Sequence, residues 1–497
     1  MSLSDIVLPV LLVSCFALLL WLPLAAIVKD RNKAGLILTT FFALFYASGH
    51  LLNKASGLIG APTNKWLVVI ITFLCLVVFA LAAYKTIKIR TSLYNLTKFL
   101  NLFAAFALLI PLTSATAGLF RQDYKNITWQ PARIASSRLE RYPDIYYIIL
   151  DGYARGDILE ELYHYENNQF LDHLVQKGFY VANKSSANYC QTVLSIASSL
   201  NFEYLDDLVK QYGAEFKSRK PVKRMIKNNR VINCLKQYGY KFVTFSSGYS
   251  LTEVRNPDKY IRPLWAFDEF QNVLLNITPL PVLSGLFSVS TGGFQYQSHR
   301  HHLLYKFEHL ADPTNMDAPV FVFAHFMAPH PPFVFDEQGK PSTPGRSFSY
   351  SDGSHFMAKA KGNRDEYIQN YRKQLIFINK KVLAAVDDII SNSSQPPIII
   401  LQSDHGAGSR YDQENVNNTY LKERMSILNA YYLPDNGRKQ LYDEITPVNT
   451  FRVILNHYFG TNYELLKDKS YYSSRSKPYK FIDVTGELKI DREPHNN

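Results

Sequence analysis

Two short motifs place acidic and histidine side chains directly after apolar runs that are typical of buried strands. Ile145–Leu150 is followed by Asp151 and a glycine, and Ile398–Leu401 is followed three residues later by Asp404, His405 and a glycine. In open α/β sheets, ligands bind beyond the carboxyl ends of the strands. Carboxylate and imidazole groups together suit zinc or manganese, so these three side chains are candidate metal ligands. Asp-Gly alone is also a common turn, whereas Ser-Asp-His-Gly after a buried strand is far more specific.

A third motif, Cys190–Gln191–Thr192, precedes a stretch of small and apolar residues, 193–201, that favours a helix. A threonine in the first turn of a helix lies at the positive end of the helix dipole, where free backbone N–H groups can receive an anion. The alternative interpretation is an ordinary threonine N-cap, and it is the preferred one if this motif is taken without the other two.

The elements that must position these motifs alternate between short apolar runs and amphipathic stretches. This alternation is typical of an α/β domain with a mostly parallel central sheet. The predicted strands include Ile145–Leu150, Tyr240–Phe245, Val320–Phe326 and Ile398–Leu401, and the predicted helices include Ile158–Lys177, Val222–Tyr238 and Asp365–Ile390.

The first quarter of the chain has a different character, with four long stretches that are almost free of charge. Each is long enough to cross a hydrocarbon core, which needs about 20 apolar residues. A cleaved signal peptide would begin with a positively charged segment, and the residues before the first stretch include none. We therefore predict four transmembrane helices, within Ile6–Val28, Ala34–Asn53, Trp66–Tyr84 and Phe99–Phe120.

The net charge of 54 − 42 = +12 is concentrated in this quarter, which carries 9 − 2 = +7. Seven basic residues fall in the first and third loops and two in the second, so the positive-inside rule makes the first and third loops cytoplasmic and places the chain after residue 120 outside. The remaining 45 − 40 = +5 is spread over 377 residues without an interleaved basic and aromatic stripe, which argues against nucleic-acid binding.

These patterns predict three parts: a transmembrane domain (1–120), a basic juxtamembrane linker (121–142) and an external α/β domain (143–497). The external domain holds two of the four cysteines, Cys190 and Cys234, and their spacing leaves open whether they are bridged. We interpret the cluster of His299, His301 and His302 as mainly surface.

Together the motifs resemble those of the alkaline phosphatase and sulfatase superfamily, and within it the membrane-bound sulfatase-like phosphotransferases such as lipoteichoic acid synthase and the phosphoethanolamine transferases. The likeness spans roughly residues 143–435. It implies a metal held by Asp151, Thr192, Asp404 and His405, with Thr192 as the nucleophile. It also implies that His330, in an Ala-Pro-His-Pro-Pro segment, contacts the substrate phosphate.

The chain departs from two patterns of this superfamily. Formylglycine sulfatases need a Cys-x-Pro-x-Arg or Ser-x-Pro-x-Arg pattern, and the segment Cys190–Leu194 lacks both the proline and the arginine. Its Cys-Gln-Thr order is instead similar to the Cys-Gly-Thr of phosphoethanolamine transferases. Those transferases carry a histidine after the Asp-His-Gly motif, but Tyr420–Pro434 has none. Arg424 is the candidate there for a phosphate contact, with a surface arginine as the alternative.

The resemblance implies a metal-dependent transferase that moves a phosphoethanolamine- or phosphoglycerol-type headgroup through a phosphothreonine intermediate. The expected partners are a phospholipid donor, a cell-envelope glycan or lipid acceptor and the membrane; the metal would be zinc or manganese, with magnesium as a further option. The expected location is the cytoplasmic (inner) membrane, with the catalytic domain on the outer or periplasmic face. Two alternatives remain: a membrane-anchored phosphodiesterase, phosphatase or other sulfatase-like hydrolase, and an inactive envelope binding or assembly module.

Overall fold

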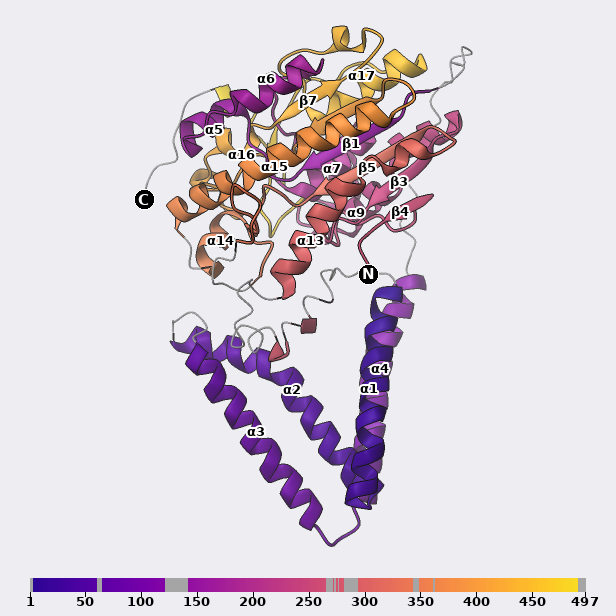
Figure 1. Ribbon diagram of the computed structural model, residues 1–497, viewed down its shortest axis with the longest axis vertical. Coiled ribbons are helices and arrows are strands. Elements are labelled where there is room, and N and C mark those ends of the chain that lie inside the picture. The colour runs from indigo at the N-terminus through magenta and orange to yellow at the C-terminus, as the bar shows by residue number, and fades with distance from the viewer. Residues whose placement is uncertain are drawn as a thin grey trace. The chain divides into compact units, whose positions relative to one another are not determined.

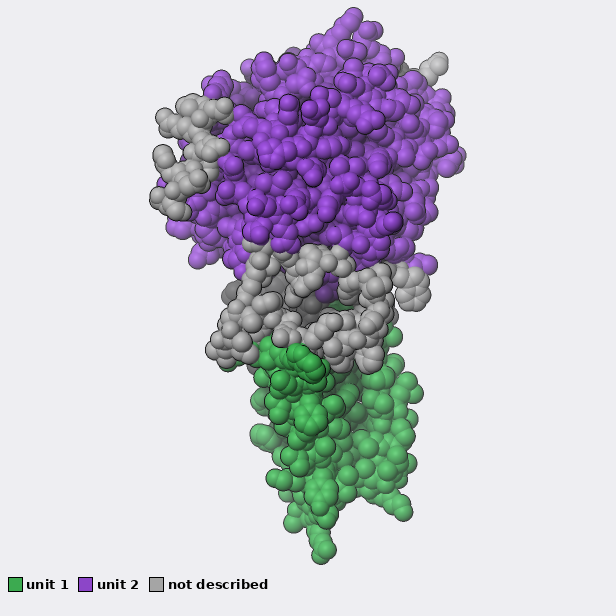
Figure 2. Space-filling view, turned by 60° about the vertical axis from the view of Figure 1, so that its left-hand side comes forward, with its two compact units in different colours: residues 1–130, 269–293 green, residues 131–268, 294–497 purple. Residues whose placement is uncertain are grey.

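The chain forms two compact units in the computed structural model, which is drawn in Figure 1. The structure describes residues 3–59, 65–120, 142–264, 271, 274–275, 277–280, 294–342, 348–360 and 363–489. Unit 1 comprises residues 1–130 and 269–293, and unit 2 comprises residues 131–268 and 294–497 (Figure 2). The predicted three-part division stays a prediction, and it differs from these units in the placement of 269–293. Apart from Tyr142, the predicted linker lies outside the described residues.

The described residues 3–120 of unit 1 form four helices rich in leucine, valine and phenylalanine. In the part of the chain that the structure describes, three segments are long and apolar enough to cross a membrane: Val10–Val28, Arg31–Leu52 and Val69–Lys88. The described apolar part of the fourth helix, Tyr94–Leu109, is shorter, so the fourth predicted span stays a prediction. Large side chains such as Leu19 and Phe73 are exposed on these helices, as expected of surfaces that face hydrocarbon. The helices are α1 (Leu3–Val28), α2 (Arg31–Ile59), α3 (Lys65–Lys88) and α4 (Tyr94–Phe120).

A lysine at the start of α2 is bonded to the end of α3. Lys33 Nζ donates to the backbone oxygens of Ile87 at 2.9 Å and Ile89 at 2.8 Å. The first and third loops, which carry most of the basic residues of this unit, therefore lie at the same end of the helices. The positive-inside argument requires this arrangement.

Unit 2 contains a seven-stranded sheet in the order β2-β7-β6-β1-β5-β3-β4. The five strands from β6 to β4 in this order run parallel, β7 pairs antiparallel with β6, and β2 pairs antiparallel with β7, which confirms the predicted mostly parallel sheet. The strands are β1 (Ile145–Leu150), β2 (Tyr180–Val181), β3 (Lys241–Phe245), β4 (Lys259–Ile261), β5 (Val320–Phe326), β6 (Ile398–Gln402) and β7 (Asn429–Tyr432); β8 (Tyr471–Tyr472) and β9 (Ile482–Asp483) form a separate pair.

Helices cover both faces of the sheet (Figure 1). Successive side chains of a strand point to opposite faces, and those of β1, β5 and β6 are buried on both. Tyr146 and Ile148 of β1 belong to the large core beneath one helix layer, whereas Tyr147 packs its ring on Phe451 of the other layer. The first layer includes α5 (Gly156–Tyr163), α6 (Asn168–Gln176), α13 (Phe294–His309) and α15 (Arg364–Asn392). The second includes α7 (Thr192–Asn201), α9 (Lys220–Lys227), α10 (Arg230–Leu235) and α17 (Pro447–Phe459), and short helices α8 (Asp206–Tyr212), α14 (Gly353–Ala360) and α16 (Leu421–Met425) complete the unit.

Two of the predicted helices are each divided in the structure. The prediction of one helix over Ile158–Lys177 is wrong because His164 adopts a left-handed conformation, with φ of 50°, and ends α5. The prediction over Val222–Tyr238 is wrong because Asn229 leaves the helical conformation and its side chain caps α10 by accepting a hydrogen bond from Ile232 N–H. In both places the amphipathic spacing continues across the break, so hydrophobic periodicity alone did not reveal it.

Candidate active site

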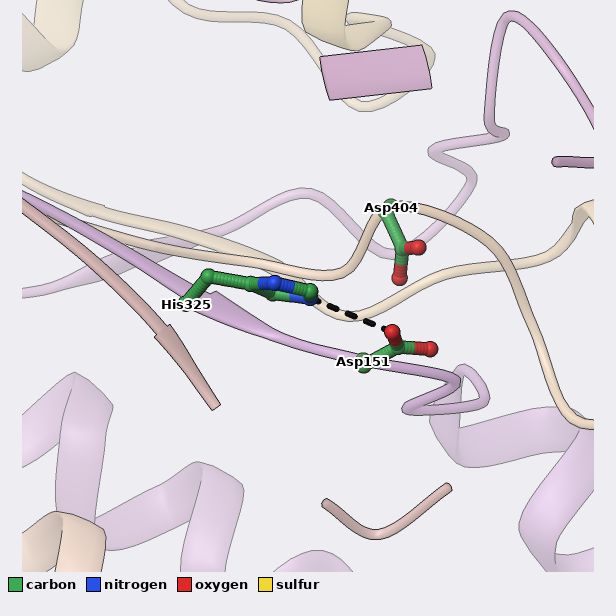
Figure 3. A group of neighbouring side chains, drawn as sticks. All are labelled: Asp151, His325 and Asp404. Carbon is green, nitrogen blue, oxygen red and sulfur yellow. Dashed lines mark hydrogen bonds and ion pairs between the residues drawn. The ribbon is translucent and has the colours of Figure 1, made fainter. Parts of the chain in front are cut away.

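Two carboxylates and a histidine meet in the interior at the carboxyl ends of three neighbouring strands. Asp151 follows β1, His325 lies near the end of β5, and Asp404 follows β6 (Figure 3). β1 lies between the other two strands, and its residue Ile149 pairs with both His325 and Gln402. One ligand atom from each of the three side chains lies within 4.8 Å of the others, and none of the three residues is more than 2% exposed.

Oxygen atoms of both carboxylates lack hydrogen-bond donors. Asp151 Oδ1 and Asp404 Oδ2 are buried without a hydrogen-bond partner. Leaving ionised oxygens uncompensated in the interior costs several kcal/mol, so such an arrangement is retained where a cation neutralises it. These side chains therefore fit a divalent metal, whose preferred ligands are carboxylate and imidazole groups.

His405 adds a nitrogen lone pair to the same place. Its Nδ1–H donates to the carbonyl of Gly406 at 2.9 Å, and its Nε2 lies 3.2 Å from Asp404 Oδ2 and 3.6 Å from Asp151 Oδ1. Burial, followed by the charge of Arg424, lowers the pKa of His405 to about 4. The imidazole is therefore neutral at pH 7 and its Nε2 is free to bind a metal. The structure thus brings together the predicted ligands Asp151, Asp404 and His405.

Thr192 lies beside this cluster at the start of α7. Its Oγ1 is 3.1 Å from His405 Nε2, and the residue is half-buried, whereas the surrounding acidic side chains are fully buried. The N-cap of α7 is Gln191, so the interpretation of Thr192 as an ordinary N-cap is wrong. The hydroxyl of Thr192 instead faces His405, one of the metal-ligand candidates, and the residue is partly exposed.

Two glycines allow the backbone to approach the site closely. Gly152 has φ of +71°, a conformation that favours glycine, and its N–H donates to Asp404 Oδ1 at 3.2 Å. At Gly406, a Cβ atom would lie 2.0 Å from the carbonyl oxygen of Glu423. Backbone conformation therefore favours glycine at 152, and close packing requires it at 406.

His330 lies next to the cluster and is buried. Its backbone N–H donates to the Asp151 carbonyl at 3.0 Å, its Nδ1–H donates to the Pro331 carbonyl at 2.5 Å, and its Nε2 is 3.8 Å from Asp352 Oδ2. Burial lowers the pKa of His330, but the carboxylates of Asp151 and Asp352 outweigh it, so the net pKa is raised. The imidazole therefore keeps a proton to higher pH than an ordinary histidine.

Arg424 is only 3% exposed, so the surface alternative for this residue is wrong. Its guanidinium bonds to Asp352 Oδ2 at 2.7 Å and to the carbonyls of Gly406 at 3.2 Å and Cys190 at 3.0 Å. The last two contacts join the segment that carries Thr192 to the segment that carries His405. Arg424 thus holds the two motif loops together.

Two residues of the site were not predicted from the sequence. His325 lies within an apolar strand, and its only signal was one histidine in an otherwise hydrophobic run. Asp352 lies in no recognisable motif; it accepts hydrogen bonds from Arg424 and from Tyr367 Oη at 2.7 Å. Cys190 is buried and free in the structure, as is Cys234, so the two are not bridged.

The interpretation of the histidine cluster as mainly surface is wrong for two of its three members. His299 and His302 lie on α13 with exposures of 4% and 5%, and only His301 is exposed. His302 Nε2–H donates to the carbonyl of Ser246 at 2.9 Å. Burial, followed by the charge of Lys306, lowers the pKa of His302 well below its ordinary value.

We expect His302 to make unit 2 less stable in acid. Unfolded His302 binds a proton below about pH 6.5 and folded His302 does not, so the free energy of unfolding falls as pH drops below 6.5, by up to about 1.4 kcal/mol per pH unit. His302→Gln offers the same donor to Ser246 and does not titrate, so its stability should fall less steeply between pH 6.5 and 5. Urea unfolding at several pH values measures both slopes, and equal slopes would contradict the expectation.

The family model described as Sulfatase matches residues 143–463, and the chain belongs to the sulfatase family. This membership confirms the family expected from the order of the motifs. The search of curated proteins gives no match.

Solved structures that are similar to the chain include the three described here. The chain is similar to the zinc complex of the C-terminal periplasmic domain of EptC from Escherichia coli, with 14% identity over 72% of this chain and 96% of that one and a TM-score of 0.46. It is also similar to the integral membrane lipooligosaccharide phosphoethanolamine transferase EptA of Neisseria meningitidis, with 12% identity over 78% of this chain and 69% of that one and a TM-score of 0.41. The third is the phosphonate monoester hydrolase of Agrobacterium radiobacter, with 14% identity over 67% of this chain and 80% of that one and a TM-score of 0.39.

Proposed function

We propose that this protein is a membrane-anchored, metal-dependent phosphotransferase. It would transfer a phosphoethanolamine- or phosphoglycerol-type headgroup from a phospholipid donor, through a phosphothreonine on Thr192, to a glycan or lipid acceptor of the cell envelope. The observation that carries the proposal is the position of Thr192: a partly exposed residue whose hydroxyl lies 3.1 Å from His405 Nε2, beside two buried carboxylates with unpartnered oxygens.

The nucleophile favours phosphoryl transfer over sulfate ester hydrolysis. Formylglycine formation needs a cysteine or serine in its own sequence pattern, and here the residue at the site is threonine, without the proline and arginine of that pattern. Asp151, Asp404 and His405 would hold the divalent metal, with Thr192 completing its ligands; zinc and manganese both suit this set. Such a metal lowers the pKa of a bound oxygen and offsets the negative charge of a phosphate.

In the first half-reaction, Thr192 loses its hydroxyl proton to solvent and Oγ1 forms a bond to the phosphorus. The bond from phosphorus to the diacylglycerol oxygen breaks, and His330 donates a proton to that oxygen. In the second, the acceptor hydroxyl gives its proton to His330 and bonds to the phosphorus. The threonine oxygen then leaves and regains a proton, so both residues return to their starting states. Arg424, on α16, would contact the phosphate from its position beside the His405 loop.

The helices of unit 1 support a lipid donor. They would keep the site at the bilayer surface, where phospholipid headgroups are presented and where released diacylglycerol stays in the hydrocarbon. The distribution of basic residues supports an outward-facing catalytic unit in the cytoplasmic membrane. A reporter enzyme that is active only outside the cytoplasm, fused after Phe120, should then be active, and an inactive fusion would reverse the orientation.

The experiment that tests the reaction uses full-length protein in vesicles with a divalent metal. The vesicles contain phosphatidylethanolamine or phosphatidylglycerol with a labelled headgroup, and diacylglycerol release is followed with and without an extract of envelope glycans and lipids. Without acceptor, release should stop near one equivalent per protein, because the labelled group stays on Thr192. Continued release with a free labelled headgroup would make the protein a hydrolase. Absence of release from both lipids would overturn the proposal.

A further inference from the structure

A line of buried hydrogen bonds leads from Asp151 into the interior of unit 2. His325 Nε2 lies 3.1 Å from Asp151 Oδ2, and His325 Nδ1 lies 2.9 Å from Thr252 Oγ1. Thr252 Oγ1 is 3.2 Å from Ser247 Oγ, which is 2.9 Å from Glu253 Oε2. All five residues are at most 6% exposed. The reaction proposed above uses only the first of them.

The direction of these hydrogen bonds is set at the Glu253 end. Glu253 Oε2 accepts from the backbone N–H groups of Ser247 and Gly248, both at 3.0 Å, and from the Ser247 hydroxyl. The other acceptor within reach of that hydroxyl is the carbonyl of Tyr249, at 3.0 Å. A carboxylate and a carbonyl can only accept, so Ser247 donates its single proton to one of them. Its oxygen already accepts from the Tyr249 N–H at 3.1 Å and has a second acceptor site, which faces the Thr252 hydroxyl.

The hydrogen bond between Thr252 and His325 can be assigned in the same way. Thr252 has one hydroxyl proton, and when it donates that proton to Ser247, its oxygen must accept from His325 Nδ1–H. The neutral imidazole then has its lone pair on Nε2, which faces a carboxylate oxygen at 3.1 Å. Two acceptors at this distance repel each other unless a cation lies between them.

We propose that Glu253, Ser247 and Thr252 form a positioning chain that holds His325 with its proton on Nδ1, so that Nε2 is a further ligand of the metal bound by Asp151 and Asp404. The inference rests on the proposed function in requiring a divalent metal at this site. Groups behind a histidine ligand set which nitrogen binds the metal, and losing one typically weakens metal binding 10–100-fold.

The backbone of His325 is also held in place. It pairs with Ile149 in the centre of the sheet, and its carbonyl accepts a hydrogen bond from the buried Lys306 Nζ at 2.6 Å. The ammonium of Lys306 lies 4.6 Å from the centre of the Phe326 ring. With its backbone and Nδ1 both fixed, His325 presents Nε2 in one orientation.

The test measures binding of Co²⁺ to full-length protein in detergent, by competition with a chelator and by visible absorption. Thr252→Val keeps the side-chain shape and removes the acceptor, and should weaken binding about 10–100-fold. The matched control is Thr244→Val, which removes an equally buried hydroxyl that donates to the Val254 carbonyl at 2.8 Å. The Thr244→Val protein should bind Co²⁺ as tightly as the wild type. His325→Gln should both weaken binding and shift the absorption bands, because a ligand nitrogen is lost.

Two results would overturn the inference. One is wild-type affinity in Thr252→Val, and the other is a folded His325→Gln protein whose Co²⁺ bands do not move, which would make His325 a hydrogen-bond donor to Asp151. Circular dichroism melting verifies that each variant is folded. The outcome is separable from the proposed reaction, because these measurements need no lipid. A protein that binds Co²⁺ through His325 but releases no diacylglycerol would contradict only the reaction.

Discussion

We expect the Thr192→Val protein to lose headgroup transfer by on the order of 10⁴-fold or more, the scale on which removing a covalent nucleophile acts. Valine keeps the β-branched shape at the start of α7 and removes only Oγ1, the atom 3.1 Å from His405 Nε2. The loss should therefore arise from the missing bond to phosphorus and not from a change in the fold. Diacylglycerol release from vesicles measures it.

The control for Thr192 lies in the same helix. Ser198 Oγ donates to the carbonyl of Glu203 at 2.7 Å, away from the acidic cluster, so Ser198→Ala should retain transfer within about tenfold, since such a change costs only the roughly 1 kcal/mol of one hydrogen bond. Mass spectrometry of acid-quenched wild-type protein should find the headgroup phosphate on the peptide that contains Thr192. An adduct on another residue, or substantial transfer by Thr192→Val, would rule out Thr192 as the nucleophile.

The second large effect is expected for Asp404→Asn, and its sign should depend on the metal. The amide oxygen can still accept the Gly152 N–H bond made by Oδ1, whereas the unpartnered Oδ2 is replaced by a neutral NH₂ group. When a chelator keeps the protein free of metal, the variant should be more stable than the wild type, because one of the two buried neighbouring carboxylate charges, Asp151 and Asp404, is removed. With metal at 100 times its dissociation constant, the wild type should gain about 2.7 kcal/mol and the variant almost nothing.

Thermal unfolding with and without metal therefore measures a reversal in the order of stability. Asp468→Asn is the matched control, since Asp468 accepts hydrogen bonds from the Thr446 backbone N–H at 3.0 Å and hydroxyl at 2.6 Å, outside the acidic cluster. It should destabilise the protein equally in both conditions and leave the response to metal unchanged. An Asp404→Asn protein that responds to metal like the wild type would exclude Asp404 as a ligand.

The strands could be predicted closely because their signals are local. β1 and β5 have the predicted bounds, and β6 extends the predicted run by one residue. Each is a short run of branched and aromatic residues buried on both faces, which distinguishes a central parallel strand without knowledge of its neighbours. The same locality explains the helix errors: the break at His164 depends on one residue's backbone conformation, which hydrophobic spacing does not record.

The motif residues Asp151, Thr192, Asp404 and His405 were also accessible from the sequence, because each follows a recognisable strand or precedes a recognisable helix. The place where these residues meet could not be predicted from the sequence. It depends on β1 lying between β5 and β6, and strand order is decided by the packing of segments more than 150 residues apart.

The same dependence explains why His325 and Asp352 could be found only in the structure. His325 resembles an ordinary buried residue of its strand until the register pairs it with Ile149 and aims it at Asp151. Asp352 gains its role through contacts with His330, 22 residues earlier, and Arg424, 72 residues later in the chain. Local hydrophobic and turn signals therefore determine the strands and their terminal motifs, whereas non-local register and burial decide which polar side chains share one site.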